Sequence, residues 1–133
     1  MTAELETTMH DVNFKQCSVC KVWLSAEDII KDPDIVPLGM SLAVDNPEKA
    51  YYYFIHNVPD CGTTFLIPVE DLAEFVAEAI PTERLTLTNH CEDHCVSIED
   101  LSECHQECYY APYRRLLLTM FEAKRLAAAQ AQQ

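Results

Sequence analysis

The chain has 133 residues, of which 49% are apolar, so it is long and apolar enough to form one ordinary domain with its own core. Its formal net charge of −13 would repel nucleic-acid phosphates from most of the surface. No apolar stretch approaches the length of a membrane span and Met1–Met9 is acidic and polar, so we expect a cytoplasmic globular protein with no nucleic-acid partner and no transmembrane segment.

The first part of the chain predicts a small α+β fold. Residues 13–24 are β-prone, and Ser25–Asp28 is a capping-box pattern that predicts a short helix ending at Pro33. Runs rich in β-branched and aromatic residues then predict an antiparallel β-meander. Its three strands are residues 38–44, 50–56 and 63–67.

The second part is expected to be mainly helical. Residues 70–80 have the apolar period of an amphipathic helix, and residues 85–87 could add a short strand. Asn89 with Glu92, and Ser97 with Asp100, are spaced as N-terminal caps, which predicts a cysteine-rich α-helical hairpin. We place the α+β unit in residues 1–81 and the hairpin with a terminal helix in residues 82–133, packed as one unit.

The final helix is expected to begin near Pro112, which suits the first turn of a helix. Its basic residues contrast with the acidic remainder of the chain: Arg114, Arg115, Lys124 and Arg125. The helix could therefore grip the acidic body, an acidic partner or a membrane surface, and it could also form a homo-oligomer contact. Its predicted buried stripe is Tyr113, Leu116, Leu117, Met120, Phe121 and Leu126.

All seven cysteines fall into two sets. The first set combines a C-x2-C pair with a later H-x4-C, and consists of Cys17, Cys20, His56 and Cys61. A tight C-x2-C turn can point backbone N–H groups at the sulfurs, as in a zinc knuckle. Val58 stands where the usual second ligand of such a knuckle would be, and His56 is the nearest substitute. The set predicts zinc bound by three cysteines and one histidine, against the alternative of ordinary buried thiols.

The second set contains two C-x3-C pairs, Cys91 with Cys95 and Cys104 with Cys108. Four-residue spacing puts both sulfurs of a pair on one face of a helix, so two helices could direct four thiolates to one point. The outcomes are zinc bound by four cysteines, or by three and a histidine; an iron–sulfur cluster; or the disulfides Cys91–Cys108 and Cys95–Cys104. In outline, the disulfide arrangement resembles the twin C-x3-C hairpins of mitochondrial intermembrane-space proteins. His90 and His94 also have the spacing of metal ligands on a helix.

The sequence lacks the common signatures of catalysis. Only two glycines occur, which excludes a dinucleotide fingerprint and a P-loop, and no thiol stands apart from the others as a nucleophile would. We therefore expect no catalytic residues, and a non-catalytic metal-binding module that binds a protein partner. Two groups of tyrosines could anchor that partner, Tyr51–Tyr53 and Tyr109, Tyr110 and Tyr113. The alternative is a thiol-redox or metal-responsive protein with zinc or an iron–sulfur cluster at the C-x3-C pairs.

Overall fold

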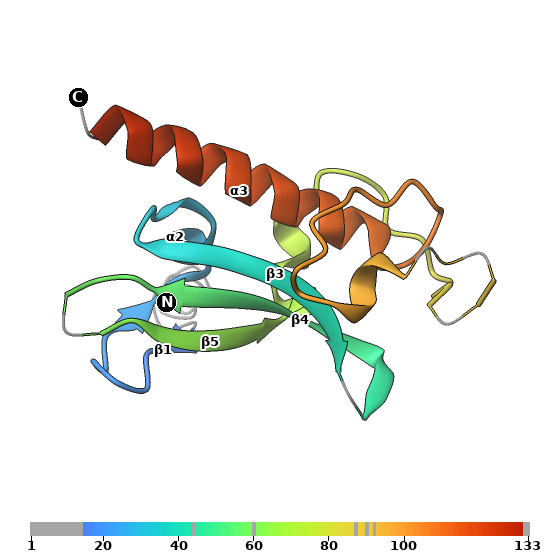
Figure 1. Ribbon diagram of the computed structural model, residues 1–133, viewed down its shortest axis with the longest axis horizontal. Helices are drawn as coiled ribbons and strands as arrows, with labels where there is room; N and C mark the ends of the chain where they lie inside the picture. The colour runs from blue at the N-terminus through green and yellow to red at the C-terminus, as the bar shows by residue number, and fades with distance from the viewer. Residues whose placement is uncertain are drawn as a thin grey trace, which may run out of the picture.

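The computed structural model describes residues 15–43, 45–59, 61–86, 88–89, 91 and 93–131. Its centre is an antiparallel sheet of three strands, β3, β4 and β5, in that order. They span Ile35–Ala43, Asn46–His56 and Thr63–Pro68. This is the predicted meander, and Figure 1 shows the long helix α3 (Ala111–Ala131) lying across one face of it.

Alternation along β4 determines which side chains reach the core. Because successive residues of a strand point to opposite faces, Ala50, Tyr52, Phe54 and His56 share the buried face of the sheet. Phe54 stacks on Phe65 of β5 with ring centroids 5.6 Å apart. His56 is therefore the last inward-facing residue of this strand, and its imidazole lies at the end of the core.

The first segments of the chain form a small hairpin and a short helix. Strands β1 (Lys15–Gln16) and β2 (Trp23–Leu24) pair with each other, and α2 follows at Ala26–Lys31. The predicted capping box is present: Ser25 Oγ accepts from the Asp28 N–H at 2.9 Å, and the Ser25 N–H donates to the Asp28 carboxylate at 2.9 Å.

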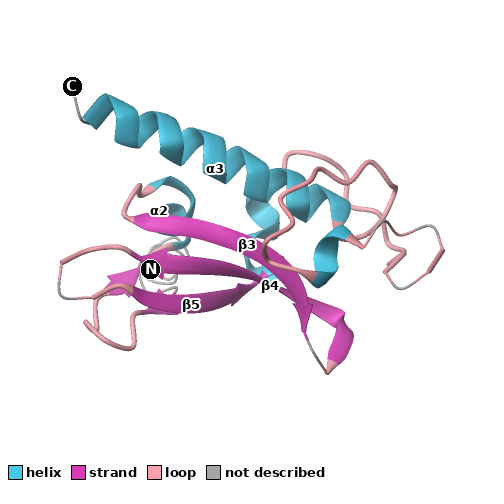
Figure 2. Cartoon of the chain, viewed as in Figure 1, coloured by secondary structure: helices cyan, strands magenta, loops and turns pink. Residues whose placement is uncertain are grey.

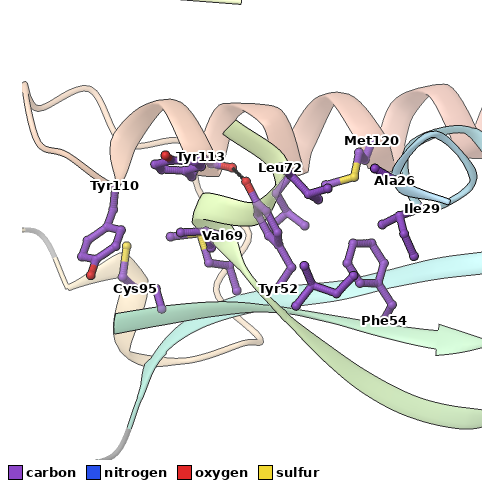
Figure 3. Packing of buried hydrophobic residues seen from close by; sticks show 14 of the residues in the cluster. Ala26, Ile29, Tyr52, Phe54, Val69, Leu72, Cys95, Tyr110, Tyr113 and Met120 are labelled. Atoms are coloured by element: carbon purple, nitrogen blue, oxygen red, sulfur yellow. Dashed lines mark hydrogen bonds between the residues drawn. The ribbon is translucent and has the colours of Figure 1, made fainter. Parts of the chain in front are cut away.

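Helix α3 packs on the sheet through one apolar stripe (Figure 3). Tyr113, Leu117 and Met120 are buried, and the Tyr52 hydroxyl donates to the Tyr113 carbonyl at 2.8 Å. Pro112 lies in the first turn, as predicted. Leu126 was expected in the stripe but is exposed, and in its place the core face contains two basic residues, Arg114 and Lys124.

The basic residues of α3 bind the body of the protein. Arg114 donates to the carbonyls of His94, Asp100 and Ser102, and Arg115 forms a bidentate pair with Glu78 at 2.8 Å. Lys124 donates to the carbonyls of Ile29 and Ile35. Of the roles expected for this helix, the structure thus supports attachment to the acidic body.

The cysteine-rich segment does not form the predicted α-helical hairpin in the described residues. Among the described residues between Phe75 and Tyr109, the single regular element is the one-turn 3-10 helix η2, His94–Val96 (Figure 2). The cap-like residues Ser97 and Asp100 instead make turns, since each side chain accepts from the N–H two residues later. Leu87, His90 and Glu92, used in the predictions of a strand, a metal ligand and a cap respectively, lie outside the described residues.

The helix predicted over residues 70–80 is also shorter than expected. Residues Val69–Phe75 form the 3-10 helix η1, and the described residues from Val76 to Tyr110 are irregular apart from η2. Even so, one hydrophobic cluster joins both parts of the chain, because Cys95, Cys108 and Tyr110 pack with the aromatic residues of β4 and the stripe of α3.

Candidate metal centre

The N-terminal hairpin brings Cys17 and Cys20 together in a tight turn. The Cys17 N–H donates to the Val22 carbonyl at 2.9 Å, and the Lys21 N–H donates back to the Cys17 carbonyl at 3.0 Å. Lys21, which directly follows the second cysteine, has a φ of 68°. Cys17 is buried and Cys20 is exposed, so the turn closes over the first sulfur.

His56 and Cys61 come from the end of β4 and the turn that follows it. Gly62 reverses the chain with a φ of 92°, and its N–H donates to the His56 carbonyl at 2.8 Å. Glycine adopts this positive φ without the steric cost of a Cβ atom. The turn therefore places the Cys61 sulfur beside the inward-facing His56 ring.

These four residues from two distant segments converge at one point. The Cys17 and Cys61 sulfurs are 3.5 Å apart, and His56 Nδ1 lies 3.6 Å from the Cys20 sulfur and 3.5 Å from the Cys61 sulfur. All four ligand atoms lie within 4.8 Å of one another, so the group could hold a metal ion. The predicted first set, including the substitution of His56 for a cysteine, is thus brought together by the fold.

Backbone N–H groups directed at the sulfurs favour thiolates in this centre. Burial of the Cys17 thiol raises its pKa, but hydrogen bonds from the N–H groups of Cys20 and Val19 outweigh burial, and the pKa falls from 9.0 to about 7. The N–H and the hydroxyl of Thr63 lower the pKa of Cys61. Because metals bind the thiolate form, these donors favour metal binding at Cys17 and Cys61. At Cys20 the Val22 N–H lowers the pKa, but burial and the neighbouring Cys17 and Cys61 outweigh it and the pKa is raised.

The second cysteine set surrounds one small cavity without closing as tightly. Cys91, Cys95, Cys104 and Cys108 all line it together with His94. Among the described residues, however, these cysteines do not form a group with all ligand atoms within 4.8 Å. The Cys95 thiol is buried, which raises its pKa to about 11 despite the nearby Arg114. All seven cysteines lie in the described part of the chain, and none of them is in a disulfide.

Sequence reasoning missed the residue that organises the second set. Arg114 is fully buried, and its guanidinium binds three carbonyls of the segment that carries Cys95 and Cys104. His94 Nδ1 is 3.0 Å from the Asp100 carboxylate, a contact that lowers the pKa of Asp100 to about 2. The one available signal was the position of Arg114 directly after Tyr113 and three residues before Leu117, both in the predicted buried stripe of the helix.

Half of the tyrosines proposed as anchors lie in the core, and the others are half-buried. Tyr52, Tyr110 and Tyr113 are buried, and Tyr109 is half-buried under the Arg84 guanidinium, which lies 4.1 Å from its ring centroid. The N-terminal hairpin has apolar side chains with larger exposed fractions: Val19 is 56% exposed and Trp23 is 48% exposed. No helix in the described residues is both long and apolar enough to cross a bilayer.

Comparisons with models of protein families, with curated proteins and with solved structures find no match for this chain. The fold and site define the class as an α+β protein with a Cys3His group that could hold a metal ion.

Proposed function

We propose that this protein is a zinc-binding, non-catalytic module that binds a protein partner in the cytoplasm. The observation that carries the proposal is the convergence of Cys17, Cys20, His56 and Cys61. Thiolate and imidazole ligands suit zinc, and a cytoplasmic location would keep the thiols reduced and available to the metal.

The distances support a tetrahedral zinc ion. With Zn–S bonds of about 2.3 Å and a Zn–N bond of about 2.0–2.1 Å, a tetrahedron has edges of about 3.8 Å between sulfurs and about 3.6 Å between sulfur and nitrogen. The corresponding separations here are 3.5 Å for Cys17 to Cys61 and 3.5–3.6 Å from His56 Nδ1 to two sulfurs. These three separations differ from the tetrahedral values by no more than about 0.3 Å, and all ligand atoms lie within 4.8 Å of one another.

The number of ligands supports a structural role for this ion. Four protein ligands complete the tetrahedral coordination of zinc and leave no position for a substrate or an activated water. The ion would join the N-terminal hairpin to the β4–β5 turn, two segments whose sulfurs are 44 residues apart in the chain. Zinc binding would therefore hold the hairpin at one end of the sheet.

The hairpin also offers an interaction surface. Val19, Val22 and Trp23 are 45–56% exposed there, and solvent-facing apolar side chains grouped in this way are typical of protein-binding sites. Lys15 and Lys21 are the charged residues of Lys15–Leu24, although the whole chain has a net charge of −13. The partner we propose is accordingly a protein with an apolar surface bordered by acidic residues.

One observation favours the alternative of a thiol-redox or metal-responsive protein. The Cys17 and Cys61 sulfurs are 3.5 Å apart, and the pKa of Cys17 is about 7. If zinc left, hydrogen peroxide could accept two electrons from this pair, giving a disulfide and two water molecules from two thiols and one peroxide. An iron–sulfur cluster in place of zinc would give the protein visible absorbance.

Metal content tests the zinc proposal. Protein purified without an affinity tag should be colourless, and Cys20→Ser and Cys61→Ser should each contain one zinc ion per chain less than the wild type. Ser18→Ala, in the same turn, is the matched control and should keep the wild-type zinc content. Equal zinc content in the wild type and both cysteine variants, or a brown protein containing iron, would contradict the proposal.

Binding to the partner tests the interaction surface. The partner should be captured by the wild type and lost from each of two single variants, Trp23→Ser and Cys20→Ser. The Trp23→Ser variant should keep its zinc. Leu126→Ser removes a similarly exposed apolar side chain from α3 and should bind normally. If no interaction depends on Trp23, or if Leu126→Ser is the variant that loses binding, the hairpin is not the interaction surface.

A further inference from the structure

The irregular segment between η1 and α3 encloses a small cavity lined by sulfur. Its walls include Cys91, Cys95, Cys104 and Cys108, and Tyr110 closes one side. The cavity has a volume of about 10 Å³, which is the space taken by one sphere of the size of a water molecule. A single metal ion matches this small space between the sulfurs.

Backbone N–H groups already point at two of these sulfurs. The Leu85 N–H donates to the Cys108 sulfur at 3.2 Å, and the Asp93 N–H donates to the Cys91 sulfur at 3.3 Å. A neutral thiol is a weak acceptor, while a metal-bound thiolate gains strongly from such donors. These contacts therefore match the donor pattern of Cys17 and Cys61 in the first centre.

A buried positive charge stands beside the third sulfur. The guanidinium of Arg114 is fully buried, and one of its nitrogens lies 3.9 Å from the Cys95 sulfur. Four thiolates around a dication carry a net charge of −2, which is costly to bury unless a cation is near. Arg114 provides that cation, and its bonds to the carbonyls of His94, Asp100 and Ser102 fix the segment that carries Cys95.

The close packing of this segment on the sheet leaves little freedom for the cavity. A Cβ atom added to Gly39 of β3 would lie 2.0 Å from the Ile98 carbonyl oxygen, so the segment touches the strand directly at Gly39. On the other side, the Tyr109 N–H donates to the Glu83 carbonyl at 2.7 Å, beside Leu85. The four cysteines are thus held on one framework, although only Cys95, in the short 3-10 helix η2, lies in a helical turn.

We propose that Cys91, Cys95, Cys104 and Cys108 bind a second zinc ion, separate from the ion at Cys17. The sulfurs would draw together around the ion, and the ion would stabilise a segment whose described residues form no regular element other than η2. The seven cysteines would then be used completely, three in the first centre and four in the second. The first centre and its zinc do not depend on this proposal.

Counting zinc ions by native mass spectrometry tests the proposal. The wild type should carry two zinc ions per chain, and Cys104→Ser and Cys91→Ser should each carry one. Leu101→Ser, an exposed position of the same segment, is the control and should carry two. In Cys104→Ser the helical circular dichroism of α3 should persist, which separates loss of one site from loss of the fold.

Two further variants test the second site without removing a cysteine: one changes the packing of the segment and the other removes a candidate histidine ligand. Gly39→Ala should push the segment away from β3 and weaken binding of the second ion about 10- to 100-fold in competition with a chelator, with the first ion unaffected. His94→Gln should still bind two ions, because four thiolates suffice; loss of an ion there would contradict the all-cysteine site.

Three results would overturn the second zinc site. One is a single zinc ion in the wild type that persists in Cys104→Ser and disappears in Cys20→Ser, which would leave the first centre intact. Another is iron with visible absorbance that Cys104→Ser abolishes. The third is a pair of disulfides among these four cysteines in protein that was freshly purified under reducing conditions and still carries zinc at the first centre.

Discussion

Single backbone conformations shape the first metal centre. Lys21 and Gly62 each follow the last cysteine of their segment, and both have positive φ, 68° and 92°. A positive φ turns the chain sharply, so the N–H groups after the cysteine face back toward its sulfur. Gly62 adopts this conformation without steric cost, whereas Lys21 adopts it with the backbone strain of a residue that has a Cβ atom.

Gly62→Ala should destabilise the zinc-loaded protein by about 1–2 kcal/mol, because an L-residue with a side chain is strained in this conformation. The added Cβ would meet no other atom within 4 Å, so the loss would report the backbone alone. Urea unfolding in the presence of zinc measures it. Gly62→Asn should lose less, since asparagine tolerates positive φ better. Equal stability of Gly62→Ala and the wild type would contradict the strain argument.

At this scale the sequence predicted the first centre well. Cys17 and Cys20 were indicated by their spacing, and His56 was indicated as the nearest substitute for a ligand at Val58. In the structure, alternation along β4 turns His56 to the core. The roles of Arg114 and Lys124 could not be predicted, because a basic residue on a helix is normally exposed. Their partners are carbonyls that only the folded chain brings near.

Helix α3 is attached to two other elements by one side chain. Lys124 donates to the carbonyl of Ile29 in α2. It also donates, at 2.5 Å, to the carbonyl of Ile35, the first residue of β3. Its ammonium also lies 5.4 Å from the centroid of the Phe54 ring. One lysine thus joins α3, α2 and the central sheet.

Lys124→Met should lower the free energy of unfolding by about 2 kcal/mol, because two buried carbonyls lose their donor. Arg125→Met, on the exposed side of the same helix, should change stability by less than about 0.5 kcal/mol. Thermal or urea unfolding monitored by the helical circular dichroism signal measures both. A Lys124→Met protein as stable as Arg125→Met would show that these two hydrogen bonds do not secure the helix.

The same residue predicts a pH dependence. Burial lowers the pKa of Lys124 from 10.5 to about 8, so between pH 8 and 10.5 the unfolded chain binds a proton that the folded chain lacks. Stability rises with pH where the unfolded state binds more protons. The free energy of unfolding of the wild type, relative to Lys124→Met, should therefore increase from pH 8 to pH 10. A constant or falling difference would contradict the lowered pKa.

Local signals predicted the elements that depend on local contacts. The capping box at Ser25 and the proline at the start of α3 are in the structure as expected. The cysteine-rich helical hairpin was wrong because spacing alone does not satisfy a helix backbone. Carbonyls of that segment bond to Arg114 and Arg115 instead, for example Cys104 O to Arg115 at 2.6 Å. Those contacts join residues far apart in the chain.

For the molecule as a whole, the two cysteine sets lie toward opposite ends of the central sheet. The N-terminal hairpin and the β4–β5 turn meet at one end, and the segment with η2 lies toward the other (Figure 1). The hydrophobic cluster under α3 lies between them. The α+β class followed from the sequence, whereas the close approach of Ile98 to Gly39 depends on the completed sheet and could not be predicted. The division of the chain at residue 81 stays a prediction.

Zinc X-ray absorption spectroscopy of the Cys104→Ser variant tests the central claim most directly, since this variant keeps the first centre alone. We predict three sulfur neighbours at about 2.3 Å and one nitrogen neighbour at about 2.0–2.1 Å for each zinc ion. A coordination shell of oxygen atoms, or a protein that retains no zinc although it is folded, would contradict the Cys3His centre.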